Sequence, residues 1–345
     1  MSNAVTTTAI ESNIAKGWKP NAYLTNMSVA HFQPDDWFVS PFIFPILPVQ
    51  LSTSTYYIFD KGDLARDNVR RKPEFGKVAP MVFGTHTDLY QCEVDQVIIG
   101  LDQISTLNYQ RAGTPGISDP RRAKVRLATE QMKIHMDRVF AEGFFKPGVW
   151  TNEYEGTDSA PSGKKFYYFD DANFDAVHFF GDKRTEMMRE GRRKPNVLAL
   201  GVEAYEGLKR NPEILERVKY SGSTANPATV NANVLAQLLE IDRVVVLNST
   251  YNAGAVGTTD MQFICDPKGA LLAFAAPNPG IDTPTAGLTF AWDMLGNGQY
   301  LAFDQYEGEG GTHTEYIEGL CSYTPKKVCD ELGYFFKDCV KAAEE

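Results

Sequence analysis

Hydrophobic residues recur at three- and four-residue steps along residues 118–145, and this spacing predicts one long amphipathic helix over 119–145. Asp119 suits the N-cap, and Pro120 suits the first helical position because the amide it lacks has no helical partner there. Arg121, Arg122 and Arg126 lie mostly on other faces. We expect the helix to act as a spine against which sheets pack. The positions of its packing face are Val125, Ala128, Met132, His135 or Met136, Val139, Gly143 and Phe144.

The second half of the chain alternates helical and strand patterns. Residues 174–191 have helical spacing with Asp175 as the expected N-cap, and residues 195–276 alternate short apolar strands with helices. Alternating segments within 285–326 predict a β-meander with a glycine-rich turn, and 327–340 is predicted to be a closing helix. The fold class indicated is α+β.

Residues 55–60 and 89–99 have strand character and predict the two arms of a long hairpin. The connecting segment carries six basic residues against four acidic ones, so the tip is locally basic within an acidic chain. A connection this long without a core of its own is usually functional or disordered. Its basic residues are Lys61, Arg66, Arg70, Arg71, Lys72 and Lys77.

The first 48 residues predict an extended arm, because repeated prolines prevent a long helix. The arm is also rich in aromatic side chains, which favours contact with an apolar surface of its own chain or of a neighbour. These aromatic residues are Phe32, Trp37, Phe38, Phe42 and Phe44.

Composition is that of a globular protein, with 43% hydrophobic and 23% charged residues. The formal net charge of −10 argues against general binding of polyanions over the outer surface. No apolar run approaches the length of a membrane span, and the first 30 residues lack the pattern of a secretion signal. Five cysteines without CxxC spacing are interpreted as buried thiols in a reducing compartment.

Motifs for catalysis, cofactors or metals are missing from the sequence, which has no GxxxxGK[ST], HExxH or GxSxG. Asp171, Asn173, Asp175 and Asp182 have the spacing of calcium ligands, but Ala176 occupies the position where that loop needs glycine, so a helix start is the preferred interpretation. His135 is interpreted as a core histidine in preference to a ligand. We therefore expect no enzyme activity, cofactor or metal.

Six segments in this order resemble the major capsid protein of tailed bacteriophages, the family with the Hong Kong 97-like fold. The resemblance runs from about residue 41 to 338. It rests on FPILPVQLSTSTYYIFDKGDLARD, the long helix ending in FFKPGVW, GRRKPNVLALGVEAYEGLKRNPEILERVKYSG, LAQLLEIDRVVVLNSTYN, ALLAFAAPNPGIDTPTAGLTFAW and DELGYFF.

The resemblance implies a division of the chain into an arm, an extended loop, a peripheral domain that holds the spine helix 119–145, and an axial domain. It also implies that the arm and the loop contact neighbouring subunits. The implied boundaries are 1–48 for the arm, 49–97 for the loop, 98–192 and 285–326 for the peripheral domain, and 193–284 and 327–345 for the axial domain. The implied contact residues are Phe32, Trp37, Phe38, Phe42, Lys61, Arg66, Arg70, Arg71 and Lys72.

The function implied is that of a structural head protein, which assembles into pentamers and hexamers of an icosahedral shell around double-stranded DNA. Its expected location is the virion capsid, after assembly in the bacterial cytoplasm. Expected partners are further copies of itself, a portal protein, decoration proteins and DNA without sequence specificity, the last through general charge compensation by surfaces such as the 121–126 face. The arm begins at Met1 and is too short for a cleavable scaffolding segment, so any scaffolding protein is expected to be separate.

Two alternatives remain open at this point. An encapsulin-like compartment would have the same fold and would enclose protein cargo. A two-domain α/β enzyme or small-molecule binder is the other alternative, because likeness of fold does not fix function.

Overall fold

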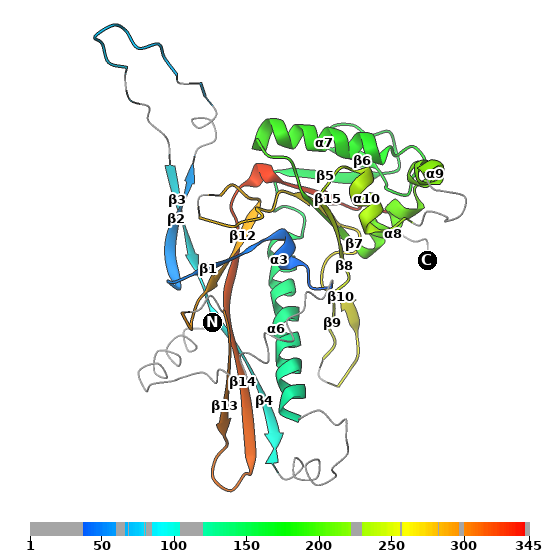
Figure 1. Ribbon diagram of the computed structural model, residues 1–345. Coiled ribbons are helices and arrows are strands. Elements are labelled where there is room, and N and C mark those ends of the chain that lie inside the picture. The colour runs from blue at the N-terminus through cyan, green and yellow to red at the C-terminus, as the bar shows by residue number, and fades with distance from the viewer. Residues whose placement is uncertain are drawn as a thin grey trace.

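The computed structural model describes residues 37–59, 66–67, 69–78, 80, 85–103, 120–221, 230–255, 257–281, 283–296 and 300–341, and all that follows concerns these residues. Phe32 and Lys61 lie outside them. Two sheets flank one long helix, and a hairpin projects away from this body (Figure 1).

The long helix is α6 (Pro120–Phe144), which confirms the predicted spine. Val125, Ala128, Met132 and Met136 pack in one hydrophobic cluster with side chains of the adjoining sheet. That sheet is five-stranded and is built on one long strand, β14 (Thr314–Lys327). Its other strands are β1 (Ile46–Val49), β4 (Val94–Asp102), β12 (Gly287–Trp292) and β13 (Leu301–Glu307).

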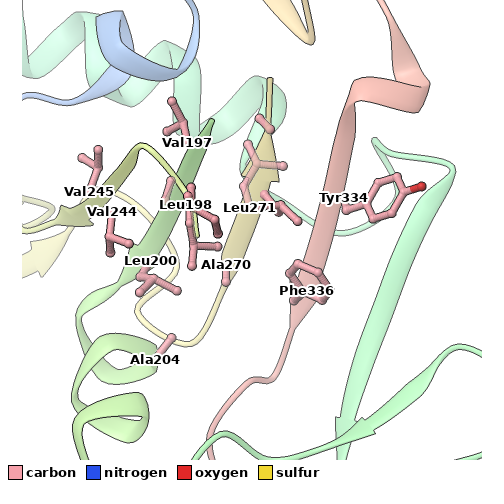
Figure 2. Close-up of a cluster of buried hydrophobic side chains, with 14 of the residues drawn as sticks. Val197, Leu198, Leu200, Ala204, Val244, Val245, Ala270, Leu271, Tyr334 and Phe336 are labelled. Carbon is pink, nitrogen blue, oxygen red and sulfur yellow. The ribbon is translucent and has the colours of Figure 1, made fainter. Parts of the chain in front are cut away.

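The second sheet has six strands in the order β6-β5-β15-β11-β7-β8. Side chains of its central strands are buried together with residues of the surrounding helices, and they form the largest hydrophobic cluster (Figure 2). Strands buried on both faces read as continuous apolar runs, as 197–201 and 270–273 do. The strands are β5 (Asn152–Thr157), β6 (Lys165–Tyr167), β7 (Val197–Gly201), β8 (Arg243–Leu247), β11 (Ala270–Ala273) and β15 (Gly333–Lys337).

Four helices belong to this second unit. Ala176, Phe180 and Met187 of α7 are buried in the largest cluster, with the six-stranded sheet. The packing of α7 therefore groups it with that sheet, whereas the sequence had grouped it with the spine helix. The helices are α7 (Ala176–Gly191), α8 (Val202–Arg210), α9 (Pro212–Ser221) and α10 (Ala232–Leu238). Three smaller elements are α3 (Ser40–Ile43), β9 (Thr250–Asn252) and β10 (Met261–Phe263).

The helix predicted over residues 327–340 is wrong. The chain there forms a short 3-10 turn, η1 (Asp330–Leu332), and then β15, which lies inside the six-stranded sheet between β5 and β11. Tyr334, Phe335 and Phe336 are all fully buried, because both faces of the sheet are covered. Gly333 is required at this position, since an added Cβ would lie 2.1 Å from the Trp150 ring.

The predicted hairpin exists, but its second arm was misplaced. β2 (Thr53–Phe59) pairs with β3 (Thr85–Gln91), whereas residues 94–102 form β4 and pair with β14. Tyr90, Cys92 and Val94 are buried and alternate with more exposed neighbours across this change of partner. The period-two pattern continues through both strands, so it could not reveal that the chain leaves one sheet and enters another.

Two further interpretations are confirmed. The Asp175 carboxylate caps α7 by accepting a hydrogen bond from the His178 amide at 2.8 Å, so the calcium-like spacing marks a helix start. The cysteines are free thiols, four of them buried and Cys329 partly buried, and the reducing compartment stays a prediction.

Candidate functional site

The tip of the β2–β3 hairpin extends away from both sheets (Figure 1). Every charged side chain described there, on residues 66–78, is exposed. Five are basic and two are acidic, and none of the basic ones forms an ion pair with another described residue. The hairpin thus presents a cationic end for which its own subunit supplies no acidic partner among the described residues. The basic residues are Arg66, Arg70, Arg71, Lys72 and Lys77.

Two large apolar side chains among these charges are almost completely exposed, and Val78 is partly so. Val69 is 91% exposed and Phe75 is 101% exposed. Complete exposure of an aromatic ring leaves apolar area in water that burial would stabilise by roughly 25 cal/mol per Å². An apolar pair surrounded by charges on a projecting element is typical of a contact surface.

The root of the hairpin is held firmly on β12. The Tyr90 ring stacks on Phe290 with centroids 4.4 Å apart, and the Tyr56 ring lies 5.3 Å from the same Phe290. The Tyr56 hydroxyl donates a hydrogen bond to Asp88 Oδ2 at 2.8 Å, and this bond holds the pKa of Asp88 below its ordinary value. These contacts of the root fix the position of the hairpin relative to the body, while its tip stays exposed.

The arm aromatics divide into exposed and internally packed groups. Trp37 is 55% exposed, and Phe38 is partly buried with the Lys133 ammonium 5.5 Å from its ring. Phe42 packs against the largest cluster and lies 4.6 Å from the Arg243 guanidinium. The described part of the arm thus packs partly on its own chain, and contact of the partly buried Phe42 with a neighbouring subunit stays a prediction.

Phe44 shows the same internal packing more strongly. It is completely buried, and its ring lies 5.2 Å from Phe140, 4.9 Å from Phe144 and 6.4 Å from Trp150. The arm is therefore fixed to the C-terminal end of α6 before it enters β1. Contact of Trp37 and Phe38 with a neighbouring subunit stays a prediction.

Asp137 joins the arm to the spine helix from a buried position. Its Oδ1 accepts a hydrogen bond from the Ser40 amide at 3.2 Å, and its Oδ2 accepts one from the Ser249 hydroxyl at 3.0 Å. Burial raises the pKa of Asp137 above its ordinary value, and the hydrogen bonds only partly oppose this. One carboxyl group thus connects α3, α6 and the segment after β8.

Replacing Asp137 by Asn is expected to preserve or increase stability near pH 7, by up to about 1 kcal/mol. The folded-state pKa is raised, so the contribution of Asp137 is favourable below its ordinary pKa and is lost as pH rises through the raised value. A neutral amide keeps the acceptor for Ser40 and removes this pH dependence. Urea unfolding at about pH 5 and about pH 7 measures the effect.

The matched variant Asp137→Ala should lose about 1–3 kcal/mol at both pH values, because it leaves the Ser40 amide without its acceptor in a buried position. Equal losses in the Asn and Ala variants would contradict the importance of the charge.

Arg121 in the first turn of α6 forms a bidentate pair with the buried Glu315 of β14. Its Nε donates to Oε1 at 2.8 Å and its terminal nitrogen donates to Oε2 at 2.9 Å. This part of the 121–126 face therefore serves an intramolecular contact, whereas Arg122 and Arg126 are exposed.

Arg121→Ala is expected to lower the free energy of unfolding by about 1–3 kcal/mol, because it leaves the Glu315 carboxylate buried without its guanidinium. The half-exposed position of Arg121 lets water replace part of the interaction. Adding Glu315→Gln should recover most of the loss in denaturant unfolding, and an unchanged loss would show that the charge of Glu315 is not its cause.

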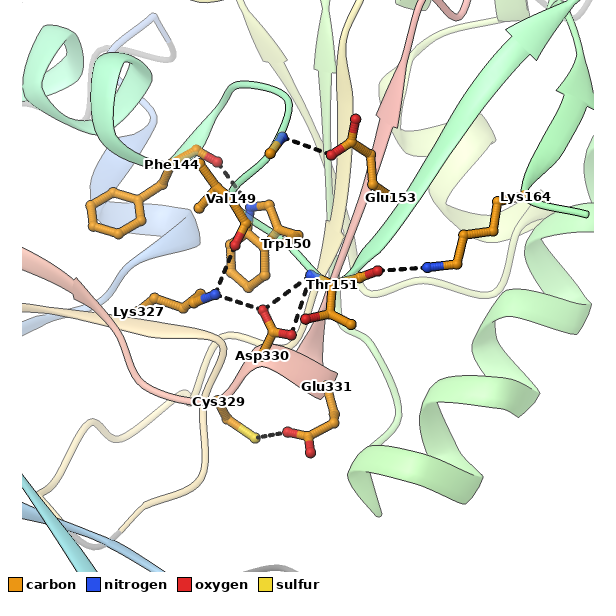
Figure 3. A network of polar contacts seen from close by, with 11 residues as sticks. Phe144, Val149, Trp150, Thr151, Glu153, Lys164, Lys327, Cys329, Asp330 and Glu331 are labelled. Carbon is orange, nitrogen blue, oxygen red and sulfur yellow. Dashed lines mark hydrogen bonds and ion pairs between the residues drawn. The ribbon is translucent and has the colours of Figure 1, made fainter.

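A second polar network fixes the end of α6 to both sheets (Figure 3). The Lys327 ammonium donates to the Val149 carbonyl and to Asp330 Oδ1, each at 2.7 Å, and the Thr151 amide donates to the same carboxylate. Burial opposes ionisation of Asp330, but the bonds from Lys327 and Thr151 hold its pKa below the ordinary value. The network joins segments far apart in sequence, so no local pattern could have predicted it.

Groups suited to chemistry are not gathered in the described part of the chain. No cluster of three His, Cys, Asp or Glu residues there could hold a metal ion. His135 lies 3.3 Å from Asp95, and its hydrogen bond to this carboxylate raises the pKa of the imidazole. No helix of the described ranges has the length and apolar character to cross a bilayer.

Comparison with solved structures identifies the architecture. A phage-related protein of Bordetella bronchiseptica superposes with a TM-score of 0.70 at 18% identity, covering 93% of this chain and 97% of that one. A protein described as a prophage capsid protein of Escherichia coli CFT073 gives 0.54 at 15% identity, over 92% and 96% of the two chains. The chain has the fold of phage capsid proteins. Identities this low establish the fold alone.

A curated relative gives a partial match in sequence. The major capsid protein of Burkholderia phage BcepMu is 25% identical over 129 residues, which are 37% of this chain and 39% of that protein. This chain therefore matches well under half the length of the relative. No family model matches the sequence.

The sequence analysis named some of the residues at the hairpin tip and missed others. Arg66, Arg70, Arg71 and Lys72 are exposed in the segment between β2 and β3, and their contact with a neighbouring subunit stays a prediction. The exposed Val69 and Phe75 were missed, although an isolated phenylalanine inside a charged loop was a signal that could have shown them. No local sequence pattern marks Asp137 or Glu315 as buried contact residues, because the residues that they bind are distant in sequence.

Proposed function

We propose that this chain is a major capsid protein of a tailed phage with the Hong Kong 97-like fold. In this function it is a non-enzymatic subunit of the pentamers and hexamers of an icosahedral shell around double-stranded DNA. The observation that carries the proposal is the hairpin, whose fixed root holds exposed basic side chains and the almost fully exposed Val69 and Phe75 away from the body. The fold shared with a prophage capsid protein supports the same function.

The energetics of assembly suit such a hairpin. A projecting tip gains burial only when another surface covers it, and obligate assemblies typically bury more than about 2,000 Å². A tip on one subunit that meets a different surface on the next makes a heterologous contact, which closes into rings around symmetry axes. The exposed Phe75 and its basic neighbours are then interface residues.

The domain division implied by the resemblance is proposed with one change. The packing of α7 with the six-stranded sheet supports assigning residues 152–191 to the axial domain, with 193–284 and 327–345. The peripheral domain then consists of α6 and most of the five-stranded sheet, whose strand β1 lies at the junction of arm and loop and whose strand β4 begins within the loop. The arm is 1–48 and the extended loop is 49–97.

Partners and location follow from the same proposal. The subunit would assemble with its own copies in the bacterial cytoplasm and would meet a portal protein and separate scaffolding or decoration proteins. Its final location would be the virion capsid. The partial match to the BcepMu major capsid protein supports this placement.

Electron microscopy of the expressed full chain tests the function. We expect closed particles of uniform diameter, with five-fold and six-fold clusters in the reconstruction. A chain that elutes as a monomer under all assembly conditions tried, with its hairpin tip protected from protease, would overturn the proposal. Particles filled with a protein and no nucleic acid in phage-infected cells would instead favour an encapsulin-like compartment.

Binding of DNA is expected to be weak and independent of sequence. The chain is acidic overall, and contacts through exposed arginines such as Arg122 and Arg126 compensate phosphate charge without reading bases. Gel shifts with two unrelated duplexes of equal length should give affinities within about twofold of each other, falling steeply with salt. A strong preference for one duplex would contradict this prediction.

A further inference from the structure

A short basic segment spans the end of α7 and its connection to β7. Residues 189–194 carry four basic side chains against the single acidic side chain of Glu190, in a chain whose formal net charge is −10. All four basic side chains are exposed. The unit built on the six-stranded sheet thus has a local cationic surface. We refer to Arg189, Arg192, Arg193 and Lys194 as the basic segment.

The backbone of the basic segment is fixed on both sides. Gly191 ends α7 against η1 so closely that an added Cβ would overlap with the Leu332 side chain. Beyond the segment, the Asn196 side chain accepts a hydrogen bond from the Ala275 amide at 2.8 Å and donates one to the Ala275 carbonyl at 2.7 Å. The four cations are therefore presented from a backbone that is already ordered.

Arg192 adopts a backbone conformation that usually belongs to glycine. It closes α7 with a φ of 56°. A Cβ is disfavoured in this left-handed region, so glycine is the usual residue at such a position. Cations near the end of a helix interact favourably with its negative pole, which accounts for Arg189 and Arg192. Arg193 and Lys194 lie beyond the last turn, so the helix alone does not explain the segment.

The subunit supplies few partners for these charges. Arg189, Arg193 and Lys194 form no ion pair with another residue in the described ranges. The Arg193 guanidinium lies 5.9 Å from the centre of the Phe274 ring, which supports its plane without neutralising its charge. Lysine is depleted at the centres of protein–protein interfaces, whereas lysine and arginine both contact phosphates in protein–DNA complexes. The chemistry of the segment therefore favours phosphate over a protein surface.

We propose that the basic segment binds the phosphate backbone of the duplex DNA enclosed by the shell. An acidic subunit repels a polyanion over most of its surface, so its contact with DNA uses local cationic surfaces such as this one. The ordered cations neutralise neighbouring phosphates without reading bases. This inference rests on the proposed shell function, and it identifies the end of α7 as a surface that faces the DNA.

Gel shifts with unassembled full-length subunits and a duplex of about 30 base pairs test the contact. The triple variant Arg189→Gln, Arg193→Gln, Lys194→Gln should bind at least about tenfold more weakly than wild type at about 50 mM salt. Its slope of log affinity against log salt should be smaller by about 2 to 3, because each lost phosphate contact removes about 0.9 from the slope. Circular dichroism and thermal unfolding verify that each variant folds.

A matched control separates the basic segment from net charge. The variant Lys146→Gln, Lys164→Gln, Arg210→Gln removes the same charge from exposed positions on three other segments. It should keep an affinity within about threefold of wild type and an unchanged salt slope. Equal losses in this control and in the triple variant would show that only the net charge binds DNA, which would overturn the inference.

A charge-conserving variant tests whether charge is what the basic segment supplies. Arg189→Lys, Arg193→Lys should keep the affinity within about threefold and the salt slope of wild type, because lysine contacts phosphate as a point charge. This agreement would support the proposed contact. A loss as large as that of the triple variant would overturn binding through charge.

Acetylation of lysine amines locates the contact in assembled particles without any substitution. An acetyl ester of N-hydroxysuccinimide modifies exposed lysines, and mass spectrometry measures the rate at each one. Lys194 should react severalfold more slowly in DNA-filled particles than in empty shells, because a phosphate then covers its ammonium group. The exposed Lys146 should react equally in both. Equal rates for Lys194 in filled and empty particles would overturn the inference.

The outcomes separate the inference from the function. Shells from the wild-type chain, together with equal DNA affinities for wild type and the triple variant, would overturn the inference while the shell function stands. A triple variant that forms no shells but binds DNA like wild type would mean that the segment contacts a protein surface, which also overturns the inference. If the wild-type chain forms no shells, the function falls, and a salt slope that depends on the basic segment would still support phosphate binding.

Discussion

A chain in which Arg66, Arg70 and Arg71 are replaced by Glu is expected to fold as a stable monomer and to form no shells. These side chains are exposed on the hairpin tip and form no ion pair with a described residue of their own subunit, so reversing them should change stability by less than about 0.5 kcal/mol. At an interface the same reversal sets like charges against each other. Electron microscopy counts the shells, and circular dichroism and thermal unfolding follow the monomer.

The matched control replaces the same three arginines by Lys, which keeps the charge and removes the bidentate geometry. We expect this control to assemble with a yield within about threefold of wild type, because steering by charge does not need the planar guanidinium group. Normal shells from the Glu variant would contradict the function assigned to the tip. Failure of the Lys variant together with the Glu variant would show that the interface depends on bidentate pairing by arginine and not on net charge alone.

Replacement of Phe290 by Ala is expected to cost about 3–5 kcal/mol of unfolding free energy and to abolish assembly. Phe290 is completely buried and carries the stacked Tyr90 and the neighbouring Tyr56, so its loss opens a cavity at the root of the hairpin. The hairpin would then lose the fixed direction that presents its tip. Denaturant unfolding measures the stability, and limited proteolysis measures access to residues 53–91.

Phe263→Ala on β10 is the control for loss of an aromatic ring, because Phe263 is 41% exposed and its replacement should cost less than about 1 kcal/mol. A Phe290→Ala chain that unfolds like this control would show that the stacked rings do not hold the hairpin. If the Phe290→Ala chain is destabilised but still forms normal shells, Phe290 contributes to stability and assembly does not depend on the hairpin direction that it fixes.

Local patterns were sufficient wherever one element could be recognised from its own residues. The spine helix follows from the spacing of Val125, Ala128 and Met132, and α7 follows from its Asp175 cap. The buried strands β7 and β11 follow from short continuous apolar runs. In each case the periodicity or the capping side chain is contained in the segment itself.

Sequence patterns failed where the structure of a segment depends on a distant segment that it pairs with. Residues 333–337 form a strand because they pair along one edge with β5 (152–155) and along the other with β11 (270–273). Both of these partners lie far earlier in the chain. The alternation through Tyr90 and Val94 continues while the chain changes sheets, so it could not locate the end of the hairpin. The bonds of Asp137 to Ser40 and Ser249 span 97 and 112 residues. Sequence spacing contains no information about such distances.

The strand β14 has a mechanical consequence for the whole subunit. Its first half pairs with β4 and β13, its second half pairs with β12, and the chain then passes through Lys327 and η1 into β15. A tension applied at the hairpin root would pass from Phe290 in β12 into this one continuous strand and along it to the centre of the other sheet. Because the ladder bonds lie across that direction, they would bear the load together in shear and not one after another, so we expect the subunit to stretch as a single elastic body.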